Sequence, residues 1–335
     1  MHSLLDPAIL FFVFGLLAGL LRSNLELPQP ISKFLSMYLL MALGLKGGFA
    51  LAASGLTSQV LTGLGLGLLL AFVVPLTGYL ALRKLLPPFD AAAVAATYGS
   101  VSAVTFVTAV QSLDRSGIAF GGHMAATMAL MESPAILLSV LLANYLRRKA
   151  GSPMPSGGTT TTNDVAGLAT PPASLRKVLH ESLTDGAQLL LLGAMAVGVL
   201  TGEAGKAAMA PFSIDLFKGM LAFFLLDMGL LTARHLSGTR GTSPWLVVYA
   251  IGGPLVHAAL ALGLAHLAGM SVGDGTLLMV LAASASYIAV PAVLRHAIPE
   301  ARPALYFGMS LGITFPFNIL LGIPLYSWLA SRVLV

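Results

Sequence analysis

The sequence predicts an all-α, polytopic membrane protein. Of its 335 residues, 57% are hydrophobic and 9% are charged, and the mean hydropathy is +0.89. A soluble domain usually carries about 25% charged residues, so this composition is typical of a chain that lies in lipid. Apolar runs of membrane-spanning length recur along the whole chain, and charged or turn-forming residues separate them.

The apolar runs predict about ten transmembrane helices. They lie at 7–22, 31–53, 57–82, 90–112, 119–146, 183–202, 211–233, 243–268, 274–298 and 303–331. No Lys or Arg precedes the first run, and Arg22 follows it. A secretory signal has the opposite order, so we expect the first run to be a transmembrane helix with its N-terminus outside the cell.

The basic residues predict the orientation in the membrane. Cytoplasmic loops carry an excess of Lys and Arg. With an outer N-terminus, most of the 18 Lys and Arg fall in inner loops, namely Arg22, Lys33, Arg83, Lys84, Arg147, Arg148, Lys149, Arg176, Lys177, Arg234, Arg240, Arg295 and Arg302. We therefore expect an inner (plasma) membrane protein with both termini outside. Its pI near 9.6 then reflects these loops rather than binding to nucleic acid.

One polar segment divides the chain into two halves. Residues 150–177 are rich in Gly, Pro, Thr and Ser, a composition typical of a disordered linker; a segment that binds a regulator is the alternative. Residues 1–149 and 178–335 each contain five predicted spans. Because five is an odd number, the second half would cross the membrane in the opposite direction to the first.

The two halves show a weak internal repeat. "GSVSAVTFVTAV" (99–110) aligns with "ASASYIAVPAVL" (283–294) at an offset of 184 residues. "ALGLKGG" and "DMGLLTA" align at an offset of 185, and "ESPAILL" and "FPFNILL" at 183. Such a register predicts a 5+5 inverted repeat, which is frequent in secondary transporters. General similarity among membrane helices is the alternative.

Both copies of the repeat contain the motif Ser-x-Ser, at Ser100–Ser102 and Ser284–Ser286. Residues two apart share a face on an extended chain but not on a helix. The motif therefore favours two broken helices that cross near the membrane midplane. Gly99 lowers the cost of the first break, and Pro291 suits the first turn of a new helix. Close helix packing by small residues is the alternative.

A crossing of broken helices has the chemistry of an ion site. Half-helix N-termini attract small anions, and free carbonyl and hydroxyl oxygens suit sodium. The candidate residues for the anion are Gly99, Ser100, Val101, Ser102, Ala103, Ser284, Ala285, Ser286 and Tyr287. The candidate sodium ligands are Ser100, Ser102, Thr105, Glu132, Ser286 and Asn318.

Two acids lie inside apolar runs. Glu132 and Asp227 would each cost about 2.5–3.5 kcal/mol to insert on translocon scales, so a functional role is the default expectation. Glu132 is the stronger candidate, because its aligned region also contains Thr314 and Asn318. A protonated or hydrogen-bonded structural acid is the alternative for both.

Four segments resemble a known family. "GLKGG" (44–48), "YGSVSAVTF" (98–106), "ASASYIAVPA" (283–292) and "SLGITFPFNILLGIPLY" (310–326) are similar to the sodium-dependent bicarbonate transporters (SbtA-like). The resemblance implies ten helices in a 5+5 inverted repeat, with a core domain that holds crossed broken helices and a gate domain. It also implies a homotrimer, sodium-coupled bicarbonate uptake and control by a PII-like cytoplasmic protein.

Other functions stay open at this point. A transporter of another small anion and a sodium/proton exchanger share the expected architecture. A membrane sensor that signals through the 150–177 linker is a non-transport alternative. We do not expect an enzyme, because the sequence offers no convincing pair of nucleophile and base.

Overall fold

The protein is an all-helical, multi-pass membrane protein. The computed structural model describes residues 6–149, 186–236 and 243–334, and none of these residues forms a strand. The predicted 150–177 linker lies outside the described residues. Seven helical stretches are long and apolar enough to cross a membrane, namely Gln29–Ser54, Ser58–Leu82, Pro88–Ser116, His123–Arg148, Gly186–Leu236, Pro244–Leu267 and Pro303–Val333. Two shorter apolar helices span Pro7–Leu20 and Val272–Ala283.

The first half of the chain forms six helices, with local signals at their ends. They are α1 (Pro7–Leu20), α2 (Gln29–Ser54), α3 (Ser58–Leu82), α4 (Pro88–Gly99), α5 (Ala103–Ser116) and α6 (His123–Lys149). Asp6 caps α1 by accepting the backbone N–H of Ala8 at 2.8 Å, and Thr57 caps α3 in the same way. Gly117 ends α5 in the left-handed conformation, with φ of 67°.

The second half is less regular than the sequence predicts. Its elements are α8 (Gly186–Ala210), η2 (Pro211–Asp215), α9 (Phe217–Leu236), α10 (Pro244–Leu267), α11 (Val272–Ala283), α12 (Ala289–Ala297), α13 (Pro303–Phe307), η4 (Gly308–Thr314), α14 (Phe315–Phe317), η5 (Asn318–Gly322) and α15 (Ile323–Val333). The span predicted at 183–202 ends before the helix in the structure, because α8 continues to Ala210. Gly202 turns the chain at φ 54°, and the Ala-rich residues after it continue as helix.

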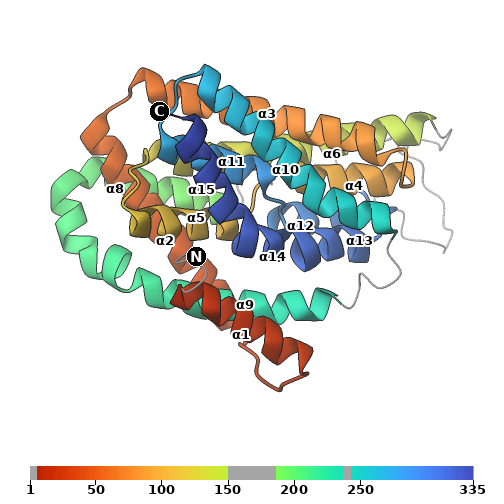
Figure 1. The fold of residues 1–335 in the computed structure, drawn as a ribbon, viewed down its shortest axis with the longest axis horizontal. Helices are drawn as coiled ribbons and strands as arrows, with labels where there is room; N and C mark the ends of the chain where they lie inside the picture. The colour runs from red at the N-terminus through yellow and green to blue at the C-terminus, as the bar shows by residue number, and fades with distance from the viewer. Residues whose placement is uncertain (1–5, 150–185, 237–242, 335) are drawn as a thin grey trace, which may run out of the picture.

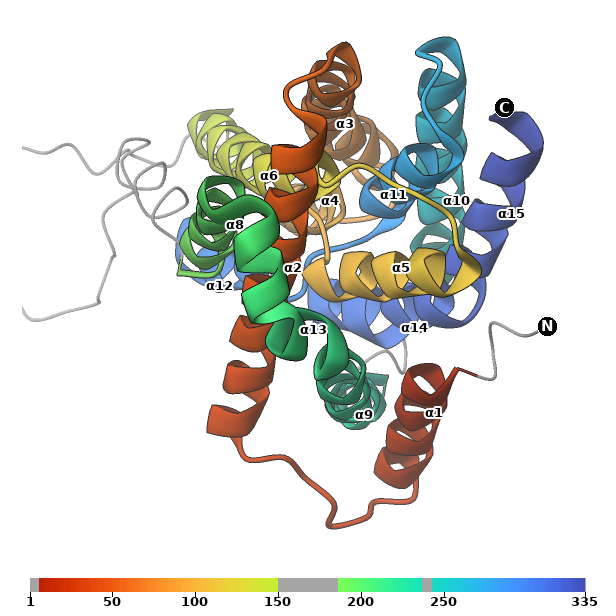
Figure 2. The same ribbon diagram turned by 90° about the vertical axis from the view of Figure 1, so that its left-hand side faces the viewer.

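Four helices pack together along one side of the molecule (Figures 1 and 2). Within this four-helix group, which comprises α1, α2, α8 and α9, α1 packs along α9 and α2 along α8. Backbones touch because glycines stand at the contacts: an added Cβ would lie 2.2–2.7 Å from a carbonyl oxygen of the partner helix at Gly15, Gly44, Gly198 and Gly229. We call the remaining helices, α3 to α6 and α10 to α15, the main bundle.

The molecule has two distinguishable ends. The α2–α3 turn, the α5–α6 loop and the α10–α11 turn lie toward the left in Figure 1, and the α3–α4 turn and the end of α6 lie toward the right. We name them the outer and inner ends, after the orientation that the sequence predicts.

Two buried carboxylates tie the broken helical segments together. Asp90, in the first turn of α4, accepts the backbone N–H of Arg302 at 2.8 Å and its guanidinium Nε at 2.9 Å. Asp274, in the first turn of α11, accepts the backbone N–H of Gly121 at 2.6 Å. Arg302 follows α12, and Gly121 follows α5. Asp90 therefore joins the start of α4 to the loop after α12, and Asp274 joins the start of α11 to the loop after α5.

Replacing Asp90 should destabilise the main bundle. The Asp90 side chain is 5% exposed, and hydrogen bonds to charged groups contribute about 1.5–3 kcal/mol. Asp90→Ala should therefore lower the apparent melting temperature of the detergent-purified protein by several degrees. The control is Glu203→Ala, which removes an acid that is 73% exposed in its pair with Lys206 and should change little. Equal melting temperatures for Asp90→Ala and wild type would contradict this role.

Candidate functional site

The first Ser-x-Ser motif interrupts a helix, as predicted. Helix α4 ends at Gly99, and Ser100 is extended, with φ −98° and ψ 173°. Helix α5 begins at Ala103, where the Oγ of Ser102 caps it by accepting the backbone N–H of Thr105 at 3.2 Å. A serine is favoured at this position because its oxygen satisfies an N–H group that has no intrahelical partner.

The second motif interrupts a helix at the aligned position. Helix α11 ends at Ala283, and Ser284 is extended, with φ −83° and ψ 164°. Helix α12 begins at Ala289 and contains Pro291 in its first turn, where a proline costs no hydrogen bond. Both breaks predicted from the sequence are therefore present in the structure.

The two unwound segments cross and hold each other. The backbone N–H of Ser102 donates to the Oγ of Ser284 at 3.0 Å, and the backbone N–H of Ser286 donates to the carbonyl of Thr97 at 2.8 Å. The hydroxyl of Ser284 also donates to the carbonyl of Leu281 at 2.9 Å. The N–H groups of Ser102 and Ser286 thus maintain the crossing, so a bound anion needs other donors.

A small cavity lies at this crossing. Its volume is about 190 Å³, and its lining is Ser36, Leu40, Val101, Ser102, Ala103, Val104, Met128, Glu132, Ala187, Gln188, Leu191, Ser286, Tyr287, Ile288 and Val293. Pockets for drug-sized ligands run from about 300 to 1,000 Å³, so this crossover cavity suits a small ion. It contains six of the predicted site residues, and the second serine of each motif is among them.

The structure places the other six predicted site residues outside this lining. They are Gly99, Ser100, Thr105, Ser284, Ala285 and Asn318. The Nδ2 of Asn318 donates to the carbonyl of Ala283 at 2.8 Å, and its Oδ1 accepts the hydroxyl of Tyr326 at 2.9 Å. Asn318 therefore supports the last carbonyl of α11 at the break.

Hydrogen-bond donors for an anion converge on the cavity at the start of α5. The Oγ of Ser102 accepts both the N–H and the hydroxyl of Thr105, the latter at 3.0 Å, and the Ser102 hydroxyl also pairs with the hydroxyl of Tyr287, which lines the same cavity. Ala103 and Val104 form the first turn of α5, where helix N–H groups have no intrahelical acceptor. This helix end also carries a partial positive charge.

Oxygen atoms that suit a cation lie on the other side of the break. Ser100 is 1% exposed, and its Oγ has no hydrogen-bond partner among the described residues. A buried polar atom of this kind needs an explanation, such as an ion or a water. Ser100 directly follows the C-terminal end of α4, where the carbonyl groups carry a partial negative charge.

Glu132 supplies a carboxylate to the crossover cavity. It lines the cavity together with Ser102 and Ser286, and its Oε2 accepts the Nε2 of Gln188 at 3.0 Å. No basic side chain is among the lining residues. Asp227, the other acid that the sequence places inside an apolar run, is absent from this lining. Within the described part of the chain, no cluster of His, Asp or Glu could hold a metal by itself.

The sequence analysis missed two polar residues of the cavity, Ser36 of α2 and Gln188 of α8. Neither stands in a motif or in the internal repeat. Gln188 did carry a signal, because it is a lone amide at the start of the apolar run "GAQLLLL". Both residues reach the cavity from the four-helix group.

One family model matches the chain. It is described as the Na⁺-dependent bicarbonate transporter superfamily, and it matches residues 7–331, nearly the whole length. No curated protein matches the chain.

Replacing Gly99 should damage the first break. A Cβ at Gly99 would lie 2.4–2.7 Å from three ring atoms of Pro75 in α3, and a proline ring cannot move aside alone. Gly99→Ala should therefore lower the melting temperature and any transport activity together. Gly65→Ala is the matched control, because nothing lies within 4 Å of its Cβ position; it should be neutral or slightly stabilising. If Gly99→Ala keeps the melting temperature and activity of the wild type, α3 and α4 do not pack this closely.

Proposed function

Because the chain belongs to the Na⁺-dependent bicarbonate transporter superfamily, we propose that it is a secondary active transporter for sodium-coupled uptake of bicarbonate. The observation that carries the proposal is the crossover cavity, where helix N–H groups, hydroxyls and one carboxylate meet around a space for small ions. Alternating access would expose this cavity to each side of the membrane in turn.

We propose that the fold is a 5+5 inverted repeat with about ten transmembrane helices. Several structural contacts support it by recurring at the offsets of the sequence repeat. The contact glycines of the four-helix group pair as Gly15 with Gly198, 183 residues apart, and as Gly44 with Gly229, 185 apart. Asp90 and Asp274, which hold the starts of the broken segments, are 184 apart. Residues 1–149 and 178–335 would be the two halves.

In this proposal the four-helix group is the gate domain and the main bundle is the core domain. The core contains both broken segments, and the gate contributes Ser36, Leu40 and Gln188 to the crossover cavity. A site shared between two bodies can change its exposure when they move past each other.

We place the anion at the start of α5. The hydroxyl of Ser102 and the N–H groups of Ala103 and Val104 would donate to it, and Ser286 and Tyr287 would face it from the second segment. The other candidates, Gly99, Ser100, Val101, Ser284 and Ala285, set the backbone path at the crossing. These donors would also accept a different small anion, which is the main alternative.

We place sodium at the end of α4. The Oγ of Ser100 and the terminal carbonyls of α4 are hard oxygen ligands, and Glu132 would supply a charge from the crossover cavity, which begins at the next residue, Val101. Ser102, Ser286 and Thr105 would add hydroxyl oxygens. Asn318 remains a candidate, because its Oδ1 accepts a hydrogen bond from the hydroxyl of Tyr326 and an amide oxygen has two lone pairs.

The wider setting rests on family resemblance. We propose a homotrimer in the inner (plasma) membrane, with both termini outside, that a PII-like protein regulates from the cytoplasm. A sodium/proton exchanger is the less favoured function, because Glu132 is the one acid among the residues that line the crossover cavity.

Uptake into proteoliposomes tests the proposed function. Labelled bicarbonate should accumulate only when an inward sodium gradient is present. Acetate and formate as competitors would identify a different small anion. Sodium-independent uptake, or sodium-driven proton movement without bicarbonate, would rule out the symport.

Replacing Ser286 should weaken apparent anion affinity. Ser286 lines the cavity, and a neutral hydrogen bond contributes about 0.5–1.5 kcal/mol, so Ser286→Ala should raise the half-saturating bicarbonate concentration several-fold. Ser139 is a matched buried serine outside this cavity, bonded to the carbonyl of Ile136, and Ser139→Ala should behave like wild type. If Ser286→Ala also keeps wild-type kinetics, the serine has only a packing role.

Replacing Glu132 should weaken the response to sodium. Glu132→Gln keeps the shape and an oxygen that can accept from Gln188, but it removes the charge. The sodium concentration for half-maximal uptake should rise, while anion saturation at very high sodium should change much less. Glu203→Gln, at an exposed acid, is the control. Lower thermal stability with an unchanged sodium titration would assign Glu132 to structure alone.

A further inference from the structure

A second cavity lies in the outer half of the molecule. Its volume is about 550 Å³, and its lining comes from α2, α5, the α5–α6 loop, α6, η2 and α9. Lys46, Asp114 and Arg115 are among its polar residues. No residue lines both this outer cavity and the crossover cavity.

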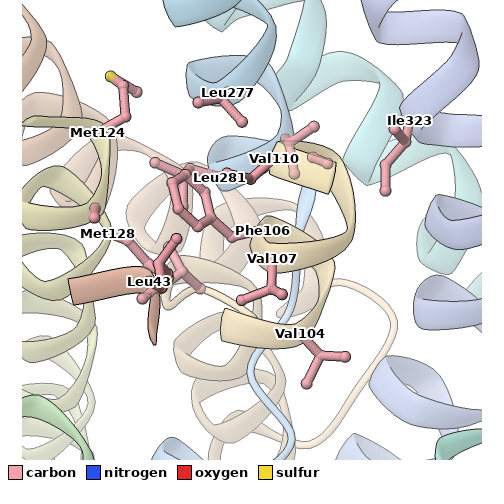
Figure 3. Close-up of a cluster of buried hydrophobic side chains, with 14 of the residues drawn as sticks. Leu43, Val104, Phe106, Val107, Val110, Met124, Met128, Leu277, Leu281 and Ile323 are labelled. Carbon is pink, nitrogen blue, oxygen red and sulfur yellow. The ribbon is translucent and has the colours of Figure 1, made fainter. Parts of the chain in front are cut away.

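An apolar layer separates the two cavities. In α2, Leu43 lines the outer cavity and Leu40 lines the crossover cavity. In α6, Met124 lines the outer cavity and Met128 lines the crossover cavity. In each helix the two residues are about one turn apart, or roughly 5 Å along the helix axis. Phe106 of α5, which is 1% exposed, completes the layer. Figure 3 shows Leu43 of α2 with Phe106 and the two methionines.

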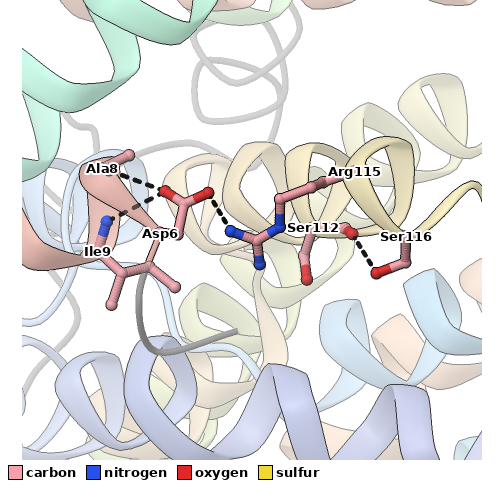
Figure 4. Close-up of polar contacts among 6 residues, drawn as sticks. All are labelled: Asp6, Ala8, Ile9, Ser112, Arg115 and Ser116. Atoms are coloured by element: carbon pink, nitrogen blue, oxygen red, sulfur yellow. Dashed lines mark hydrogen bonds and ion pairs between the residues drawn. The ribbon is translucent and has the colours of Figure 1, made fainter. Parts of the chain in front are cut away.

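Two ion pairs at the outer cavity join the gate domain to the core domain. The Nζ of Lys46 in α2 lies 3.3 Å from the Oδ2 of Asp114 in α5. The guanidinium of Arg115, the next residue in α5, binds Asp6, which caps α1 (Figure 4). Lys46 and Asp6 belong to the gate side, and Asp114 and Arg115 to the core side.

The other ion pairs between described residues each stay within one domain. At the inner end, Arg147 with Glu300 and Arg302 with Asp90 lie within the core. Arg234 with Glu26 lies within the gate, and so does Lys206 with Glu203 near the outer end. Among the described residues, the two ion pairs that join the domains therefore both lie at the outer cavity, while the hydrogen bond from Gln188 to Glu132 joins them at the crossover cavity.

We propose that the Lys46–Asp114 and Arg115–Asp6 pairs are a latch that holds the outer entrance closed above the Leu43–Phe106 layer. The structure is then the inward-facing form, and both pairs separate when the crossover cavity turns outward. This inference rests on the proposed function, because a latch between domains has a role only if they alternate.

The exposure of the pairs suits a latch that opens in every cycle. The side chains are 24% and 39% exposed in the first pair and 33% and 13% in the second. Water screens such pairs, so each contributes little to the closed form. Losing one pair should shift the equilibrium between closed and open forms by about two- to fivefold.

Sided thiol labelling tests the latch. The chain has no cysteine, so Leu40→Cys places a single thiol in the crossover cavity. A membrane-impermeant methanethiosulfonate reagent added from the outer side should label it slowly. Adding Lys46→Gln should raise the outer labelling rate about two- to fivefold and lower the inner rate. Val293→Cys, on the core side of the same cavity, is a second reporter if Leu40→Cys folds poorly.

Two controls separate a latch from general loosening. Lys206→Gln breaks a pair inside the gate and should leave both labelling rates unchanged. The charge swap Lys46→Asp with Asp114→Lys should restore slow outer labelling. A protein that is only destabilised would label faster from both sides, and that result, or an unchanged outer rate, would overturn the latch. Labelling needs no transported ion, so failure here with normal sodium-driven uptake would leave the proposed function intact.

Discussion

The structure depends on the way in which two unwound segments satisfy each other inside a membrane. Free backbone N–H and carbonyl groups cannot stay unpaired in lipid. Here the N–H of Ser102 donates to the Oγ of Ser284, and the N–H of Ser286 donates to the carbonyl of Thr97. This exchange keeps both helices broken. At the first break, the C-terminal end of α4 and the N-terminal start of α5 also lie close together. The former attracts a cation and the latter an anion.

Further contacts within the main bundle support this crossing. Asp90 and Asp274 fix the starts of the broken segments to each other's loops, and Asn318 holds the carbonyl of Ala283. The side chains of these three residues are buried, and their bonds lie within the main bundle. By contrast, the ion pairs that reach the four-helix group are partly exposed. Buried side chains thus tie the crossing to the main bundle, whereas partly exposed ion pairs and the hydrogen bond from Gln188 to Glu132 join it to the four-helix group.

Small residues allow this arrangement in a chain with few charges. Glycine contacts bring α1 against α9 and α2 against α8 at backbone distance, so dispersion contacts contribute to the stability of the four-helix group. Gly99 lets α4 lie on the ring of Pro75 at the point where the helix ends. Gly99 therefore has two effects: it weakens the helix, and it permits the close contact with α3 at the residue where α4 ends.

The sequence alone determined the properties that local patterns encode. Run length and charge predicted a multi-pass helical protein, and Ser-x-Ser with Gly99 and Pro291 predicted both breaks, because helix ends depend on a few adjacent residues. Only the tertiary structure decided which serines face the cavity, how Gln188 meets Glu132 across 56 residues, and how Asp90 meets Arg302 across 212. Such contacts depend on how helices cross, and no local pattern records the angle or the register of a crossing.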